Sequence, residues 1–153
     1  MWEPYLSKLK RGSEQLLPPG EEVLAAFVAR PRGWTQTTAG SAALGAATQG
    51  RAYAAGEKSG LTLASPMALA LTRSQLLVLR IGSPIGLGIG GKVKEIMSAV
   101  PVGAVDSIAA RNLLLGKVVT VTVRGNPVNL EANAMANVRG LVNAFNEIRA
   151  GSV

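Results

Sequence analysis

The chain has 153 residues and a net charge of +7, from 16 Lys and Arg against 9 Asp and Glu. It contains neither cysteine nor histidine, which excludes disulfides, thiolate and imidazole metal sites, cysteine nucleophiles and histidine-based acid–base catalysis. Because the few carboxylates are scattered, we expect a protein that is not an enzyme, with no catalytic residue, metal site or cofactor. The composition suits a cytoplasmic protein, and no run reaches the ~18 apolar residues of a membrane-spanning helix.

The first part of the chain predicts a helix followed by a strand. Residues 1–19 are expected to form a helical extension that ends at the Pro18-Pro19-Gly20 turn. The stretch EEVLAAFVARP, residues 21–31, then predicts a strand that is apolar on both faces and should therefore be well covered. A short helix has the same apolar content, and periodicity alone does not separate the two.

Residues 33–65 form a region of biased composition, rich in Ala, Gly, Thr and Ser. Alanine favours a helix, whereas Gly40, Gly45, Gly50 and Gly56 each weaken one. We therefore expect an insertion that is helical in part. Two interpretations stay open: a variable insertion in the domain, or a packing surface through which copies form a homo-oligomer.

From residue 67 the apolar residues recur with a period of two, which is typical of β-strands. MALALT and QLLVLRI, separated by Arg73 and Ser74, predict a β-hairpin. The stretch KEIMSAVPVGAVDSIAAR, residues 94–111, predicts one long strand or two. KVVTVTVRG and VNLEAN then predict another hairpin around Gly125-Asn126-Pro127. Together these stretches predict an antiparallel barrel of about seven strands.

The chain closes with a predicted helix that has one apolar face. Asn133 is a suitable N-cap, Gly151 is a suitable stop, and residues 150–153 form a short tail. The apolar positions at helical spacing are Met135, Val138, Leu141, Val142, Phe145 and Ile148. A helix with a single apolar face is expected to cover one side of the barrel.

Three stretches in this order resemble the bacterial pleckstrin-homology-like (PH-like) and GRAM-like domains. They are LPPGEEVLAAF, ALALTRSQLLVLR, and VPVGAVDSIAAR followed by VTVTVRGNPVNLEAN and the helix. The resemblance covers residues 20–149, with residues 33–65 as an insertion. It implies a mainly β, α+β fold: a bent antiparallel β-barrel, open at one end and capped there by the C-terminal helix. It also implies a module that binds lipid head groups or proteins.

The glycine-rich stretch GLGIGGKV, residues 86–93, matches two nucleotide-binding patterns in part. Gly86, Gly88 and Gly91 fit a dinucleotide-binding turn, and Lys92 extends the match toward a phosphate-binding loop. Val93, however, replaces the hydroxyl residue that would bind magnesium. Only eight residues separate Gly91 from the next strand mark at Val100, too few for a helix that crosses a sheet. We interpret the stretch as a hairpin loop and keep nucleotide binding as a lesser alternative.

The basic residues are concentrated in residues 66–125. This stretch contains seven basic and two acidic residues, so its net charge is +5. Such a balance favours an anionic partner. Lys92 and Lys94 follow a loop whose apolar residues are Ile85, Leu87 and Ile89. An apolar tip flanked by lysines suits an anionic membrane. In the alternative interpretation, the tip packs on the barrel or on a second subunit.

The resemblance adds a second candidate contact for an anionic ligand. The head-group site of these domains lies on the first two strands and the loop between them, where this chain has Arg30 and Arg32. The long insertion replaces that loop. Nucleic acid is not an expected partner, because none of the six aromatic residues interleaves with the basic strands. The expected function is a non-enzymatic binding module, peripheral to the inner membrane face or acting as a protein scaffold, with homo-oligomeric assembly as the alternative.

Overall fold

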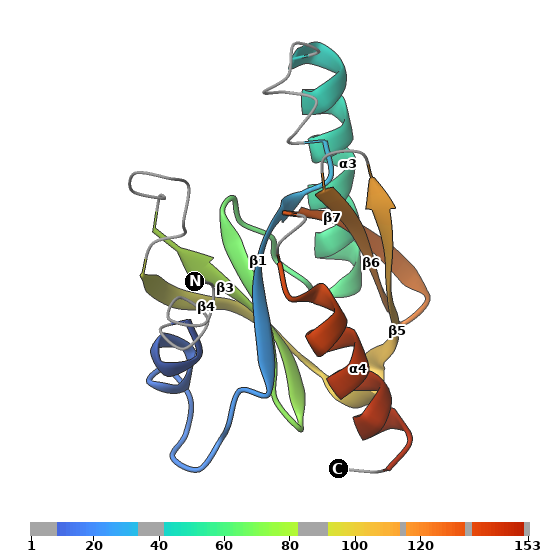
Figure 1. Cartoon of the computed structure of the whole chain (residues 1–153). Coiled ribbons are helices and arrows are strands. Elements are labelled where there is room, and N and C mark those ends of the chain that lie inside the picture. Colours follow the sequence, from blue (N-terminus) through green and yellow to red (C-terminus); the bar gives the residue numbers. More distant parts are fainter. Residues whose placement is uncertain (1–8, 34–41, 83–91, 114–115, 134–135, 152–153) are drawn as a thin grey trace.

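A computed structural model of the chain (Figure 1) contains one antiparallel sheet of seven strands, in the order β4-β3-β2-β1-β7-β6-β5. It describes all residues except 1–8, 34–41, 83–91, 114–115, 134–135 and 152–153. The strands are β1 (Ala25–Pro31), β2 (Met67–Leu71), β3 (Gln75–Ile81), β4 (Val93–Pro101), β5 (Val105–Leu113), β6 (Gly116–Val123) and β7 (Asn126–Ala132). The helices with known bounds are α3 (Ala42–Ser59) and α4 (Val138–Arg149). The predicted fold class is confirmed: mainly β, with about seven antiparallel strands and a C-terminal helix.

The first and last strands meet in the middle of the sheet, where β1 pairs with β2 on one side and β7 on the other. The sheet is open, because β4 and β5 stand at opposite ends of the strand order. These two strands follow each other in the chain, joined by the 3-10 turn Val102–Ala104. Residues 94–111 therefore belong to two strands. The sheet has two halves, β1–β4 and β5–β7, joined where β1 pairs with β7.

The inner face of the sheet holds the main core, which both halves share. Its side chains are aliphatic apart from Phe27 and Phe145, as the composition predicts. Helix α4 contacts β1, β2 and β5, and it buries Val138, Leu141 and Phe145 in this core. Val142, which was expected to be buried too, is half-buried at the side of the helix. The predicted cover of the sheet by the C-terminal helix is thus confirmed.

Helix α4 begins later than the sequence predicts. Its N-cap is Asn137 and not Asn133, because the Asn137 side chain accepts a hydrogen bond from the Gly140 N–H. Both residues can cap a helix, so the residue type alone did not distinguish them. The stop at Gly151 is confirmed: this glycine has a φ of 76°, which side-chain-bearing residues rarely adopt.

In the part of the chain that the structure describes, the outer face carries an apolar cover over the β1–β4 half. There a second apolar cluster joins Ala68 and Ala70 of β2 and Leu77 and Leu79 of β3 to residues of the N-terminal segment. That segment has a short helix over residues 9–14, and its Leu9 is buried against the sheet. Figure 1 shows this helix, in blue, lying on the side of β3 and β4. The strands β2 and β3 are therefore buried on both faces.

The Ala/Gly-rich insertion contains the 18-residue helix α3, in agreement with the partly helical segment expected there. Helix α3 packs mainly on β7, and Ala52 is the residue of the helix buried in the main core. Its last turn lies close to Leu61 and Leu63, because Gly56 has no side chain; a Cβ there would collide with the Leu61 carbonyl oxygen. The N-terminal part of the helix extends beyond the sheet, as Figure 1 shows.

Candidate functional site

Lys92 and Lys94, two of the predicted contact residues, lie at the beginning of β4 and are both exposed. Strand β4 is irregular here: Glu95 pairs with Arg80 and Val93 with Ile81, so Lys94 is an extra residue in the ladder. Such a bulge bends a strand and redirects its side chains. The bulge places the Lys94 side chain beside Gly82, within 3.2 Å of the position that a Cβ of residue 82 would occupy.

The N-terminal helix brings two further cations to the same end of β4. Gly12 packs on Val93 so closely that a Cβ on Gly12 would lie 3.2 Å from a methyl group of Val93. Lys10 and Arg11, next to Gly12 on this helix, are exposed. We call Lys10, Arg11, Lys92 and Lys94 the basic rim. Its two pairs are about eighty residues apart in the chain and adjoin one another through the Gly12–Val93 contact.

The acids near the basic rim already have partners. Glu95 forms an ion pair with Arg80 at 2.7 Å, so the charges of these two exposed residues offset each other. Glu14 accepts a hydrogen bond from the Val23 N–H at 2.8 Å, which ties the N-terminal helix to the segment before β1. The four cations of the rim form no ion pair with a described acid, so their charge is available to a partner in solution.

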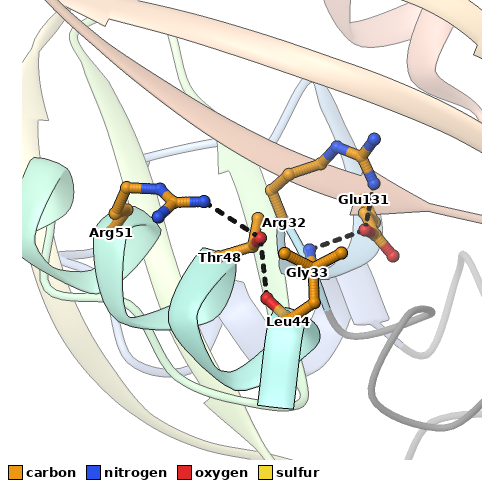
Figure 2. A network of polar contacts seen from close by, with 6 residues as sticks. All are labelled: Arg32, Gly33, Leu44, Thr48, Arg51 and Glu131. Atoms are coloured by element: carbon orange, nitrogen blue, oxygen red, sulfur yellow. Dashed lines mark hydrogen bonds and ion pairs between the residues drawn. The ribbon is translucent and has the colours of Figure 1, made fainter. Parts of the chain in front are cut away.

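Arg30 and Arg32 lie elsewhere, at the end of β1 where it pairs with β7. The Glu131 carboxylate accepts hydrogen bonds from Arg32 Nη1 at 2.6 Å and from the Gly33 N–H at 2.7 Å, as Figure 2 shows. The Glu131 side chain is only 7% exposed. Arg30 stands directly opposite Glu131 in the strand pairing, and burial lowers the pKa of its guanidinium. This corner therefore contains a buried carboxylate held between basic residues and a backbone amide.

The same corner fixes helix α3 to the end of β1. Gly33 has a φ of 104°, and a Cβ there would lie 2.7 Å from the Gly45 carbonyl oxygen. Only glycine fits both the backbone conformation and the close approach. On the facing side of α3, Thr48 donates to the Leu44 carbonyl and accepts from Arg51 (Figure 2). The end of β1 is thus connected to β7 through Arg32 and to the insertion through Gly33.

The glycine stretch lies largely outside the described residues, and so do Ile85, Leu87 and Ile89. The residues that follow it are described: Val93 opens β4, which pairs antiparallel with β3. A dinucleotide turn or a phosphate-binding loop requires a helix at this point. The surroundings of Lys92 thus differ from both nucleotide-binding patterns.

Two searches of the described residues bear on the function. No group of three or more carboxylates lies close enough together there to hold a metal ion. No described helix is both long enough and apolar enough to cross a membrane.

Comparison of the chain with protein-family models and with curated proteins found no match.

Sequence reasoning missed two features of the surface. Lys10 and Arg11 belong with Lys92 and Lys94, but only the packing of Gly12 on Val93 reveals it. Glu131 was expected on the polar side of an alternating strand, and it is buried instead. One signal was present: Glu131 lies in the final hairpin, and an acid in the middle of a sheet needs a basic neighbour.

Proposed function

We propose that this chain is a non-enzymatic, PH-like binding module that attaches to an anionic membrane surface through the basic rim. The observation that carries the proposal is the contact between Gly12 and Val93, which gathers four exposed cations at one end of β4. The described acids nearby are engaged with Arg80 and with a backbone amide. A surface of one sign attracts an extended anionic partner more strongly than scattered charges do.

The expected affinity of the rim is modest. Each lysine or arginine near an anionic surface contributes about 1 kcal/mol, so four contribute about 4 kcal/mol. That free energy corresponds to a dissociation constant of about 1 mM, which describes reversible and salt-sensitive attachment. Entry of the apolar residues Ile85, Leu87 and Ile89 into the interface would add affinity. The proposal therefore predicts two components of binding, one that salt screens and one that it does not.

Co-sedimentation with vesicles of phosphatidylcholine, with and without phosphatidylserine, tests the attachment. We expect binding to the anionic vesicles that weakens between 0.05 and 0.5 M salt, as screening shortens the range of the charges to about 4 Å. The double variant Lys92→Glu, Lys94→Glu should bind at least about tenfold more weakly, because two attractions become repulsions. Lys10→Glu with Arg11→Glu should have a similar effect if both pairs face the membrane.

The matched control is Lys58→Glu with Arg139→Glu, two exposed cations on α3 and α4. It changes the net charge by the same amount and leaves the basic rim intact. If the control loses as much binding as the rim variants, the net charge and not the rim is responsible. Equal binding to neutral and anionic vesicles would exclude the proposal.

A further inference from the structure

Among the described strands, β5 forms one edge of the sheet and pairs with β6 alone. From Ser107 to Leu113, its residues are exposed except Ile108. The pairing with β6 is regular over these seven residues, with one irregularity before them, between Val105 and Ser107. Neither a proline nor a bulge interrupts this part, and Arg111 is its one charged residue. Prolines, bulges and charged side chains are the features that normally keep an exposed edge from pairing with another strand, and this part of β5 has only Arg111 among them.

The direction of the backbone groups in β5 follows from the β6–β7 hairpin. Its two-residue turn, Arg124-Gly125, has positive φ at both positions, 49° and 81°. In such a type I′ hairpin, the residues that flank the turn exchange both hydrogen bonds, and every second pair along the strands does the same. Val121 therefore bonds to β7, and Thr120 directs its N–H and carbonyl toward β5.

The alternation continues into the edge strand. Ala109 lies opposite Thr120 and bonds to it, as every second residue of β5 bonds to β6. The residues of β5 that alternate with these bonded residues are Ile108, Ala110 and Asn112, and they direct their N–H and carbonyl groups away from β6. Their side chains leave the strand edge accessible, because alanine is small and Ile108 points into the core. The open edge thus presents three donors and three acceptors in regular order.

We propose that this edge pairs with the same edge of a second copy of the chain, with the two β5 strands antiparallel and related by a two-fold axis. Residues opposite each other must point to the same face of the joined sheet. A centre at Ala109 meets this condition: Ala109 faces its own copy, Arg111 faces Ser107, and Ile108 exchanges hydrogen bonds with Ala110. Each of these three pairs contains at least one small residue, Ala or Ser, so the two strands can approach closely at the centre of the interface.

Charge selects the second copy as the partner. Strand β5 carries an acid, Asp106, near its beginning and a base, Arg111, near its end, and both are exposed. One carboxylate oxygen of Asp106 accepts a hydrogen bond from the Gly125 N–H, and this bond leaves the negative charge at that end of the strand. Antiparallel pairing brings the acidic end of one copy beside the basic end of the other. In the register centred on Ala109, the two Arg111 residues lie four residues apart along the strands, about 14 Å. At physiological salt this separation exceeds the screening length of ~8 Å, so their repulsion is small.

Sedimentation equilibrium up to about 1 mM protein tests the pairing, because two short strands bury less surface than a stable interface and association should be weak. Ala110→Pro removes an N–H that points away from β6, so the fold tolerates it while the interface loses a hydrogen bond in each copy. We expect the dissociation constant of the dimer to rise at least about tenfold. Ala110→Ser keeps the N–H and should leave the dimer unchanged. A chain that stays monomeric at 1 mM overturns the proposal.

Amide hydrogen exchange shows where the copies meet. With rising concentration, the amides of Ile108, Ala110 and Asn112 should become protected, whereas those of Ala109 and Arg111 are already bonded to β6. Leu44→Glu, on the exposed side of α3, should leave the dimer intact. If Leu44→Glu abolishes association and Ala110→Pro does not, the copies meet through the insertion and the proposal is wrong.

Discussion

The two halves of the sheet differ in whether their outer face is covered. In the β1–β4 half, the outer face is covered by the N-terminal segment, and every residue of β2 is buried. In the β5–β7 half, the outer face stays open, and it carries Thr120 bonded to Asn129 at 2.7 Å. The sequence differs accordingly: MALAL is apolar throughout, whereas KVVTVTV alternates. A continuously apolar strand therefore indicates a covered outer face even in an antiparallel sheet.

The two edges differ in the same way. Strand β4 has two register shifts and the charged residues Lys94 and Glu95 along its length, which make pairing with another strand unfavourable. Strand β5 is regular beyond Asp106, and in that regular part Arg111 is the one charged residue. We therefore connect charge recognition with the β4 edge and strand pairing with the β5 edge.

Truncating a side chain on the inner face that both halves share should lower the free energy of unfolding the most. Phe145 of α4 is 2% exposed and packs in the main core. Phe145→Ala should lower the free energy of unfolding by about 4 kcal/mol, because a large cavity remains. Urea denaturation measures it. A loss below ~0.5 kcal/mol would mean that α4 is not docked on the sheet.

Truncations on the outer face should lower the free energy of unfolding by very different amounts in the two halves. Leu77 of β3 lies under the N-terminal segment and is fully buried, whereas Thr122 of β6 is half-exposed on the open face. Leu77→Ala should cost about 3 kcal/mol. Thr122→Ala should cost less than about 1 kcal/mol, mainly through its lower strand propensity. Similar losses at the two sites, measured by urea denaturation, would remove the distinction between a covered and an open half.

A smaller effect is expected where the halves join. Glu131 holds Arg32 and the Gly33 amide, so Glu131→Gln should cost about 2 kcal/mol by weakening two charge-assisted hydrogen bonds. The matched control is Glu95→Gln at the β4 edge, which breaks an exposed ion pair and should cost less than about 0.5 kcal/mol. Equal losses would contradict a structural role for the buried carboxylate.

Local patterns predicted a large part of this fold, because strands and helices are read from neighbouring residues. The hairpins of MALALT with QLLVLRI and of KVVTVTVRG with VNLEAN are where alternation placed them. The helix in residues 33–65 was ambiguous, because the glycines that weaken a helix also permit close packing, as Gly56 does beside Leu61. The covering of β3 on both faces was not predicted, although its uninterrupted apolar run from Leu76 to Leu79 is the pattern of a strand buried on both sides.

The candidate site was less predictable, because its residues are brought together by tertiary packing. Nothing in the local sequence of Lys10 and Arg11 indicates that Gly12 packs on Val93. The partner of Arg32 lies 99 residues away in the chain. The bulge at Lys94 was equally hidden, since an extra residue in one strand is defined only by the strand beside it.

The smallest predicted effect concerns a polar anchor of the N-terminal segment. Ser74, in the β2–β3 turn, donates a hydrogen bond to Glu21 Oε1 at 2.8 Å, and this bond is the main cause that lowers the pKa of the Glu21 carboxyl below its ordinary value. Ser74→Ala should therefore raise the pKa of Glu21 toward that value, as a pH titration of its side-chain NMR signals would show.

The sign of the linked stability follows from the lowered pKa. A carboxyl that is more acidic in the folded chain stabilises the fold above its unfolded pKa, and this stabilisation disappears as the pH falls through the folded value. The stability difference between the wild type and Ser74→Ala should therefore be present at neutral pH and shrink in the acidic range below about 4. A difference that stays constant across this range would show that Ser74 contributes through the turn it forms with Thr72 and not through Glu21. The covering segment would then be held on the β1–β4 half by its apolar contacts and by the bond between Glu14 and Val23.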